Sequence, residues 1–264
     1  MRCSYLASRR WQALQGLLLS LIAAGTLASQ SSAAPSRAPA AGREGWTIDQ
    51  STLIFGEMSV IVCAKGIKAT NNKHGMSMLC VAPFKEVVLF SERSKKYCIV
   101  PFSQFRCPAG RTLAVVNSGL LNEAPMVQKA DATYQQMKVS VFASTAQFKL
   151  AQQGRFRAHE IPSRGPMIVE CYATSDLKVD QNAGLALCHF FGLPELKGLP
   201  VYARFIDLDG DKNMALTSLN PRKTRLSDAC FDLPPTYQKV ARHEDLFVGP
   251  NTADELDLMN LGGR

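Results

Sequence analysis

Hydrophobic and polar residues alternate over short stretches of this chain, in the pattern that is typical of half-buried β-strands. Strands are expected at residues 59–65, 76–82, 86–91, 96–102, 134–143, 166–174, 201–208 and 214–219. Turn-forming or charged residues separate these runs, and the first four follow one another at spacings of about 10 residues, as in an antiparallel meander. The pattern therefore indicates a largely antiparallel sheet.

One helix is expected from Asp180 to Phe191. Asp180 is a favoured N-cap residue, apolar side chains recur at helical spacing after it, and Gly192 ends the segment. Residues 118–132 lack alternation, so we expect helix and loop there, crossing one face of the sheet. A sheet with one or two helices belongs to the α+β class.

The first two strands are expected to form a hairpin. Facing residues of an antiparallel hairpin have a constant sum of positions, and Cys63 with Cys80 centres the hairpin on Asn71 and Asn72. This register places the two cysteines opposite each other, where a cross-strand disulfide is geometrically feasible. It also gathers five apolar side chains on the other face of the hairpin: Val60, Val62, Ala64, Leu79 and Val81.

The N-terminus is typical of a secretory signal, residues 1–33. A basic segment ends at Arg9 and Arg10, an apolar run follows to Ala28, and small residues lead to a cleavage site after Ala33. The apolar run is shorter than the roughly 20 residues that span a bilayer, which favours cleavage over a retained anchor. We therefore expect a protein of the periplasm, the cell envelope or the exterior, with no integral membrane span after cleavage.

Four parts follow from this division of the chain: the signal at 1–33, a flexible linker at 34–45, a single α+β domain at 46–250 and a tail at 251–264. The formal net charge is +8, and removal of the three signal arginines leaves +5. Lysines and arginines are scattered along the chain. This pattern is not typical of a nucleic-acid-binding protein.

Seven cysteines follow the signal, and an oxidising compartment favours their pairing. The expected links are Cys63 with Cys80, Cys98 with Cys107, and one among Cys171, Cys188 and Cys230. One cysteine is left over, and a buried free thiol is favoured over a reactive one.

Patterns for metal binding or nucleophilic catalysis are missing from the sequence. There is no C-x-x-C and no H-E-x-x-H, and the neighbours Cys188 and His189 diverge on a helix. Residues 207–213 alternate oxygen-bearing side chains as a calcium-binding EF-hand loop does, but Lys212 replaces its glycine and Ser218 its final glutamate. Turn chemistry is favoured there over a calcium site. We expect no cofactor and no metal, and a protein that is not an enzyme.

Three C-terminal motifs carry a resemblance to a known family. GLPV at 198–201, D-x-D-G-D at 207–211 and F-x-L-P-x-x-Y at 231–237 resemble the C-terminal part of exported bacterial proteins with a LolA-like half-barrel. The resemblance implies a curved antiparallel sheet that closes part of a barrel, with helices as a lid. Its concave side would hold acyl chains of lipoproteins or other hydrophobic ligands.

Eight residues could supply that concave surface: Val60, Val62, Leu79, Val81, Leu89, Val139, Phe205 and Leu216. The alternative is that they form a filled core. Three functional hypotheses remain open. The protein binds a lipid or a lipidated protein, it is a disulfide-stabilised interaction module without a small ligand, or it is a hydrolase or thiol oxidoreductase.

Overall fold

The computed structural model describes residues 42–71, 73, 76–108, 121–149, 151, 167–177, 179–207 and 209–246. The chain divides into two compact units, Met1–Ala38 and Pro39–Arg264. The first unit, with the expected signal, and the expected tail at 251–264 lie outside the described residues. The expected linker at 34–45 is described only from Gly42. All the described residues belong to the second unit.

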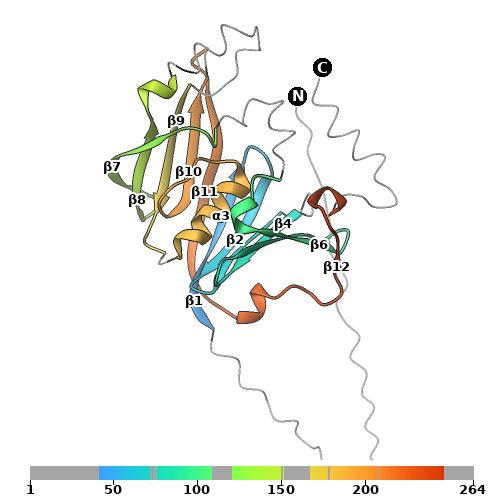
Figure 1. The fold of residues 1–264 in the computed structure, drawn as a ribbon. Coiled ribbons are helices and arrows are strands. Elements are labelled where there is room, and N and C mark those ends of the chain that lie inside the picture. Colours follow the sequence, from blue (N-terminus) through green and yellow to red (C-terminus); the bar gives the residue numbers. More distant parts are fainter. Residues whose placement is uncertain are drawn as a thin grey trace, which may run out of the picture. The chain divides into compact units, whose positions relative to one another are not determined.

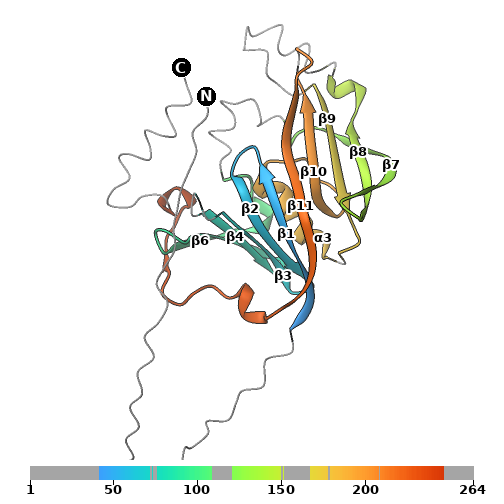
Figure 2. The same ribbon diagram turned by 180° about the vertical axis from the view of Figure 1, so that it is seen from behind.

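Twelve strands in the described residues form one sheet (Figures 1 and 2). Their spatial order is β12 (Gln238–Lys239), β6 (Lys96–Pro101), β5 (Glu86–Ser91), β4 (Met76–Val81), β3 (Gly66–Thr70), β2 (Gly56–Cys63), β1 (Arg43–Thr52), β11 (Lys212–Leu226), β10 (Leu199–Ile206), β9 (Ile168–Thr174), β8 (Met137–Ser144) and β7 (Met126–Tyr134). Neighbours pair antiparallel, except that β12 runs parallel to β6. The end strands β12 and β7 do not pair with each other, so the sheet stays open.

Helical segments are few in the described residues. They are α3 (Gln181–Phe191), the short 3-10 helices η1 (Phe102–Gln104), η3 (Asp228–Phe231) and η4 (His243–Leu246), and a helical turn at 146–149. None of these helices has the length and apolar character that a bilayer span requires. An open, mostly antiparallel sheet with few helices confirms the predicted α+β class.

Helix α3 begins and ends as the sequence predicts. The Asp180 side chain accepts a hydrogen bond from the backbone N–H of Asn182, and Gly192 closes the helix in the left-handed conformation at φ 66°. The helix contacts β10 as well as β3 and β4, which lie at the other side of the sheet order. Five strand spacings, about 24 Å, separate β4 from β10. An 11-residue helix is only about 16 Å long, so the sheet must curve around it.

Strand β1 was not predicted from the sequence. The structure begins it at Arg43, which pairs with Leu226, so the predicted linker extends into the strand. Its polar sequence, REGWTIDQST, carries only two large apolar residues, Trp46 and Ile48, and thus a weak alternation signal. Similarly, β11 continues through Asn220 and Pro221, where the sequence predicted an end.

The predicted register of the first hairpin is wrong. Strand β3 lies between β2 and β4, in the segment that was expected to be a turn. Cys63 is therefore opposite Gly66, and Cys80 is opposite Ile67. The two cysteines also belong to different hydrophobic clusters. The structure forms no disulfide between them, because a whole strand separates them.

Residues 126–132, expected as helix and loop, belong to the edge strand β7. All seven side chains from 127 to 133 are exposed. A strand that is exposed on both faces has no hydrophobic alternation, so periodicity could not reveal it.

Two hydrophobic clusters cover opposite faces of strands β2 to β5. The larger one includes α3, and the smaller one includes Phe231 and Tyr237 of the F-x-L-P-x-x-Y motif. The Tyr237 ring lies 5.9 Å from the ring of Phe90 on β5. The motif thus holds the C-terminal segment against the outer face of the sheet.

Candidate functional site

Seven of the eight residues predicted to line a concave ligand surface are buried in packed clusters, and Val81 is partly buried. Six belong to the larger cluster under α3, and none of the six is more than 7 % exposed: Val60, Val62, Leu89, Val139, Phe205 and Leu216. Leu79 and Val81 belong to the smaller cluster, on the opposite face. Their expected place beside Val60 and Val62 is therefore wrong, because it depended on the hairpin register.

Helix α3 fills the concave side of the sheet. Phe190 is fully buried, and its ring stacks on the ring of Phe55 with 4.6 Å between centroids and 7° between planes. At Gly184 the helix approaches β10 so closely that a Cβ atom would lie 2.4 Å from the carbonyl oxygen of Gly198. Such contact is typical of a close-packed interior and not of a loosely placed lid. The apolar side chains on the concave side of the sheet therefore pack against one another.

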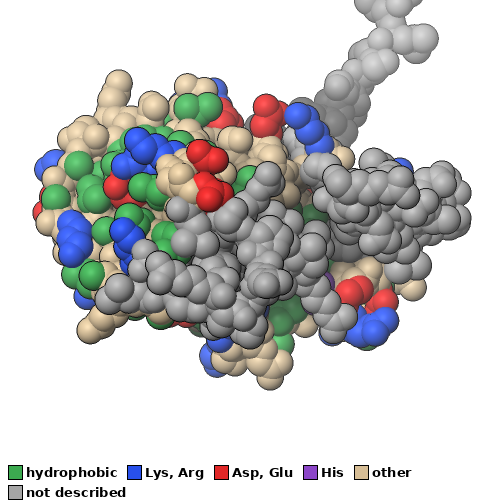
Figure 3. All heavy atoms as spheres, turned by 90° about the horizontal axis from the view of Figure 1, so that it is seen from above, with side chains coloured by type: hydrophobic (Ala, Val, Ile, Leu, Met, Phe, Trp, Pro, Cys, Tyr) green, Lys and Arg blue, Asp and Glu red, His purple; other side chains and the backbone are tan. Residues whose placement is uncertain are grey.

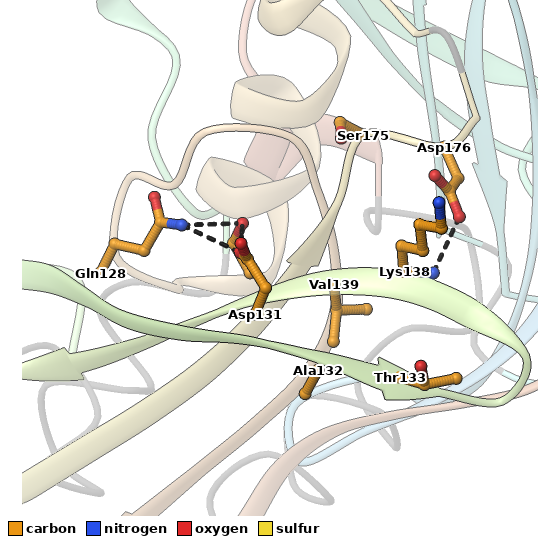
Figure 4. Close-up of a pocket in the computed structure, with 9 residues that line it drawn as sticks. Gln128, Asp131, Ala132, Thr133, Lys138, Val139, Ser175 and Asp176 are labelled. Carbon is orange, nitrogen blue, oxygen red and sulfur yellow. Dashed lines mark hydrogen bonds between the residues drawn. The ribbon is translucent and has the colours of Figure 1, made fainter.

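A pocket of about 540 Å³ lies beside the edge strand and touches the apolar core at Val139 (Figure 4). Strands β7 and β8 and the turn after β9 supply its lining: Gln128, Asp131, Ala132, Thr133, Lys138, Val139, Ser140, Ser175 and Asp176. Seven of these nine side chains carry a hydrogen-bonding group, and three of them are charged. The pocket is therefore suited to a polar ligand.

Hydrogen bonds hold the polar side chains of the pocket in place. The Gln128 amide nitrogen Nε2 donates to Asp131 Oδ1 at 3.0 Å and to Ser140 Oγ at 3.1 Å, and Ser140 Oγ donates to the same carboxylate oxygen at 2.9 Å. At the other end, Asp176 Oδ2 accepts from the backbone N–H of Lys138 at 2.8 Å. The cluster places hydrogen-bond donors and acceptors next to one another, among them the Ser140 hydroxyl beside the Asp131 carboxylate.

Sequence reasoning missed this pocket. Gln128 and Asp131 were expected in helix and loop, and Lys138 and Ser140 lie in the expected strand at 134–143, to which no function was assigned. Asp131 is directly opposite Ser140 in the β7–β8 pairing. Only that pairing brings the two residues together, and β7 carries no pattern that indicates it.

Cys63, Cys80, Cys98, Cys171, Cys188 and Cys230 are free thiols in the structure, so the predicted disulfides do not form there. Five of them are buried, and for four of these five burial is the main cause that raises the pKa: to about 12 for Cys80 and Cys188, to about 11 for Cys98, and well above 9 for Cys171. A thiol is nucleophilic as the thiolate. These four side chains are therefore inert at neutral pH, which is the opposite of what thiol chemistry requires.

In the acidic turn between β10 and β11, the carboxylate of Asp207 is hydrogen-bonded to other residues of the turn and to Asn213. Asp207 is 6 % exposed, and it accepts hydrogen bonds from the backbone N–H groups of Asp209 and Asp211 and from the Asn213 side chain. The described residues contain no cluster of three or more His, Cys, Asp or Glu side chains that could hold a metal ion. Turn chemistry accounts for the motif.

Replacement of Asp207 by alanine is expected to lower the free energy of unfolding by about 1–3 kcal/mol, because it removes the acceptor of three hydrogen bonds. Asp207→Asn keeps one oxygen and should lose less. Urea unfolding of both variants measures the difference. Calcium should leave the melting temperature of the unaltered protein unchanged, and a clear upward shift would contradict our interpretation of the loop.

No protein-family model matches the chain, and no curated protein matches it. Solved structures do resemble it. An uncharacterized conserved protein from Thermus thermophilus is 13% identical with a TM-score of 0.41, and the match covers 76% of this chain and 91% of that one. A complex of MucA and MucB from Pseudomonas aeruginosa is 8% identical with a TM-score of 0.33, and the match covers 75% of this chain and 58% of that one.

A LolA superfamily protein from Nitrosomonas europaea is also among the similar structures. It is 9% identical with a TM-score of 0.23, and the match covers 74% of this chain and 91% of that one. A likeness to LolA superfamily structures, which the C-terminal motifs predicted, is thus found. The open, curved sheet itself follows from the strand order and from the contacts of α3. These similarities concern the fold, so we argue the function from the geometry of the chain itself.

Proposed function

We propose that this protein is an exported, non-catalytic binding protein whose partner docks at the polar pocket beside β7. One observation carries the proposal. The apolar residues of the concave face are packed under α3, whereas the pocket is lined by hydrogen-bonding groups on an exposed hairpin. The interaction-module hypothesis is therefore favoured over carriage of a lipid inside the sheet.

The chemistry of the pocket indicates the class of partner. Sites for small apolar ligands are lined mainly by hydrophobic side chains. Here one ammonium group, Lys138, lies among the carboxylates of Asp131 and Asp176 and several hydroxyl and amide groups. Such a mixture of donors and acceptors fits a polypeptide segment, which offers both kinds of group along its backbone. The charged surface seen in Figure 3 likewise interleaves Lys and Arg with Asp and Glu.

Export rests on the signal-like segment at residues 1–33. In that case the protein reaches the periplasm, the cell envelope or the exterior. The five cysteines that are buried as free thiols do not need pairing to be protected there, because bulky oxidants cannot reach them in the folded state.

Native mass spectrometry tests the first half of the proposal. The protein is purified after export without detergent, and its native mass is compared with its denatured mass. We expect the mass of the polypeptide chain without bound lipid. A stoichiometric acyl lipid that leaves on denaturation would show that the interior opens for a ligand, and would overturn the proposal.

Photo-crosslinking tests the second half. Benzoylphenylalanine is introduced at Thr133 in the pocket, and at Arg222 on β11 as an equally exposed control. In intact envelopes we expect from Thr133 a discrete adduct with a different protein, of a mass other than twice that of the chain, and no adduct from Arg222. Equal labelling from both positions, or lipid adducts alone, would contradict docking at the pocket.

A further inference from the structure

Strand β7 ends the sheet with an edge that pairs with no described strand. One side of β7 pairs with β8 along its whole length, and β8 in turn pairs with β9. The nine residues of β7 have no buried side chain, and those from 127 to 133 are all exposed. Such an edge offers backbone N–H and C=O groups to another strand.

The hairpin turn decides which backbone groups face outward. Gln135 and Gln136 both have positive φ, 48° and 65°, and they form a two-residue turn between Tyr134 and Met137. Tyr134 and Met137 therefore form a hydrogen-bonded pair, and the pairs alternate along the ladder. The N–H and C=O groups of Asp131 and Thr133 consequently point away from β8, toward the open edge.

The charged side chains on β7 determine which strands can pair with its open edge. Lys129 and Asp131 flank Ala130, and the pairing with β8 shifts its register by one residue between Gln128 and Ala130. A bulge and a lysine are devices that guard an edge strand against indiscriminate pairing. A suitable partner strand must therefore offer an acidic residue opposite Lys129 and a basic residue opposite Asp131.

Strand β7 itself meets that requirement. Two copies that pair antiparallel about Lys129 place lysine opposite lysine, and two that pair about Asp131 place aspartate opposite aspartate. When the pairing is centred on Ala130, Lys129 lies opposite Asp131 of the partner subunit, and the same contact recurs across the two-fold axis. Cross-strand pairs of opposite charge stabilise a sheet, and like charges destabilise it.

We propose that two copies of this protein form a two-fold symmetric dimer in which their β7 strands pair antiparallel about Ala130 and join the two sheets. An isologous contact of this kind closes on itself and does not grow into a fibre. The dimer goes beyond the proposed function and does not rest on it, although Asp131, one of its charged residues, also lines the pocket.

Disulfide trapping tests the register. Ala130 would lie directly opposite Ala130 of the partner subunit in a non-hydrogen-bonded pair, with Cα atoms about 4.5 Å apart, which is within the range of a disulfide. Ala132 would be separated from its own copy by about 14 Å along the strands. With oxidised glutathione, which takes up two electrons and two protons to give two glutathione thiols, Ala130→Cys should form a covalent dimer. Ala132→Cys, equally exposed, should not.

Sedimentation velocity of the purified chain tests the charge pattern. The unaltered protein should associate as its concentration rises through the micromolar range. Lys129→Gln should weaken the dimer, and Lys129→Asp should weaken it about tenfold, because two attractive pairs become repulsive. The proposal is overturned if the protein stays monomeric throughout, or if Ala130→Cys and Ala132→Cys cross-link equally. Neither result depends on whether a lipid co-purifies, so this failure is distinct from failure of the proposed function.

Discussion

Replacement of Phe190 by alanine should lower the free energy of unfolding by about 3–5 kcal/mol, the loss typical of a phenylalanine removed from a packed core. Phe190 is fully buried on α3 and stacks on Phe55. Urea unfolding followed by circular dichroism measures the change. Asn182→Ala, on the exposed side of the same helix, should change stability by no more than about 0.5 kcal/mol.

The Phe190→Ala variant also tests whether the interior of the protein can bind an apolar ligand. A cavity left by Phe190 would be apolar, and apolar cavities bind small apolar molecules. We expect an apolar fluorescent probe to bind saturably to Phe190→Ala and not to the unaltered protein. A loss below about 1 kcal/mol, or saturable probe binding to both proteins, would mean that α3 is a movable lid. Carriage of a lipid inside the sheet would then be favoured over the interaction-module hypothesis.

Raising the pH from 8 to 10 should lower the free energy of unfolding by about 1.4 kcal/mol for each of three buried thiols, Cys80, Cys188 and Cys98. Burial raises the pKa of Cys80 and Cys188 to about 12 and that of Cys98 to about 11, from an ordinary value of 9.0. In the unfolded chain these thiols ionise from about pH 9, while in the folded protein they stay protonated. Their stabilising contribution is therefore complete below pH 9 and is lost as the pH rises toward 11–12.

Urea unfolding at pH 8 and pH 10 measures this loss. Cys188→Ala removes one ionising thiol, so its loss between the two pH values should be smaller by about 1.4 kcal/mol than that of the unaltered protein. Leu187→Ala, a neighbouring buried position on α3, destabilises the protein without removing a thiol and should keep the full loss. Equal losses in all three proteins would show that these thiols do not titrate differently in the two states.

Strands with one buried face were predictable from the sequence because alternation reports local burial. The Glu86–Ser91 strand was predicted with the bounds of β5, and α3 was predicted from its cap residues and apolar spacing. A largely antiparallel α+β sheet follows from these elements. Strands β1 and β7 were missed because their polar residues give weak alternation or none.

The candidate site could not be predicted for the same reason. Its residues lie on both strands of a hairpin whose outer strand is polar on both faces, and they meet only through the pairing of Asp131 with Ser140. Seven of the eight residues predicted to line a ligand surface are buried, and Val81 is partly buried. The use of these residues was not visible in the sequence, because a packed core and a lined cavity have the same hydrophobic pattern.

The sequence by itself determined which segments hide one face from water, where α3 begins and ends, and that the chain forms a largely antiparallel sheet with a helix. These properties depend on neighbours within a few residues. The tertiary structure alone decided that β3 separates Cys63 from Cys80, that α3 fills the concave side, and that β7 stands exposed at the edge. Those outcomes depend on pairing and packing between distant segments, and local periodicity carries no information about them.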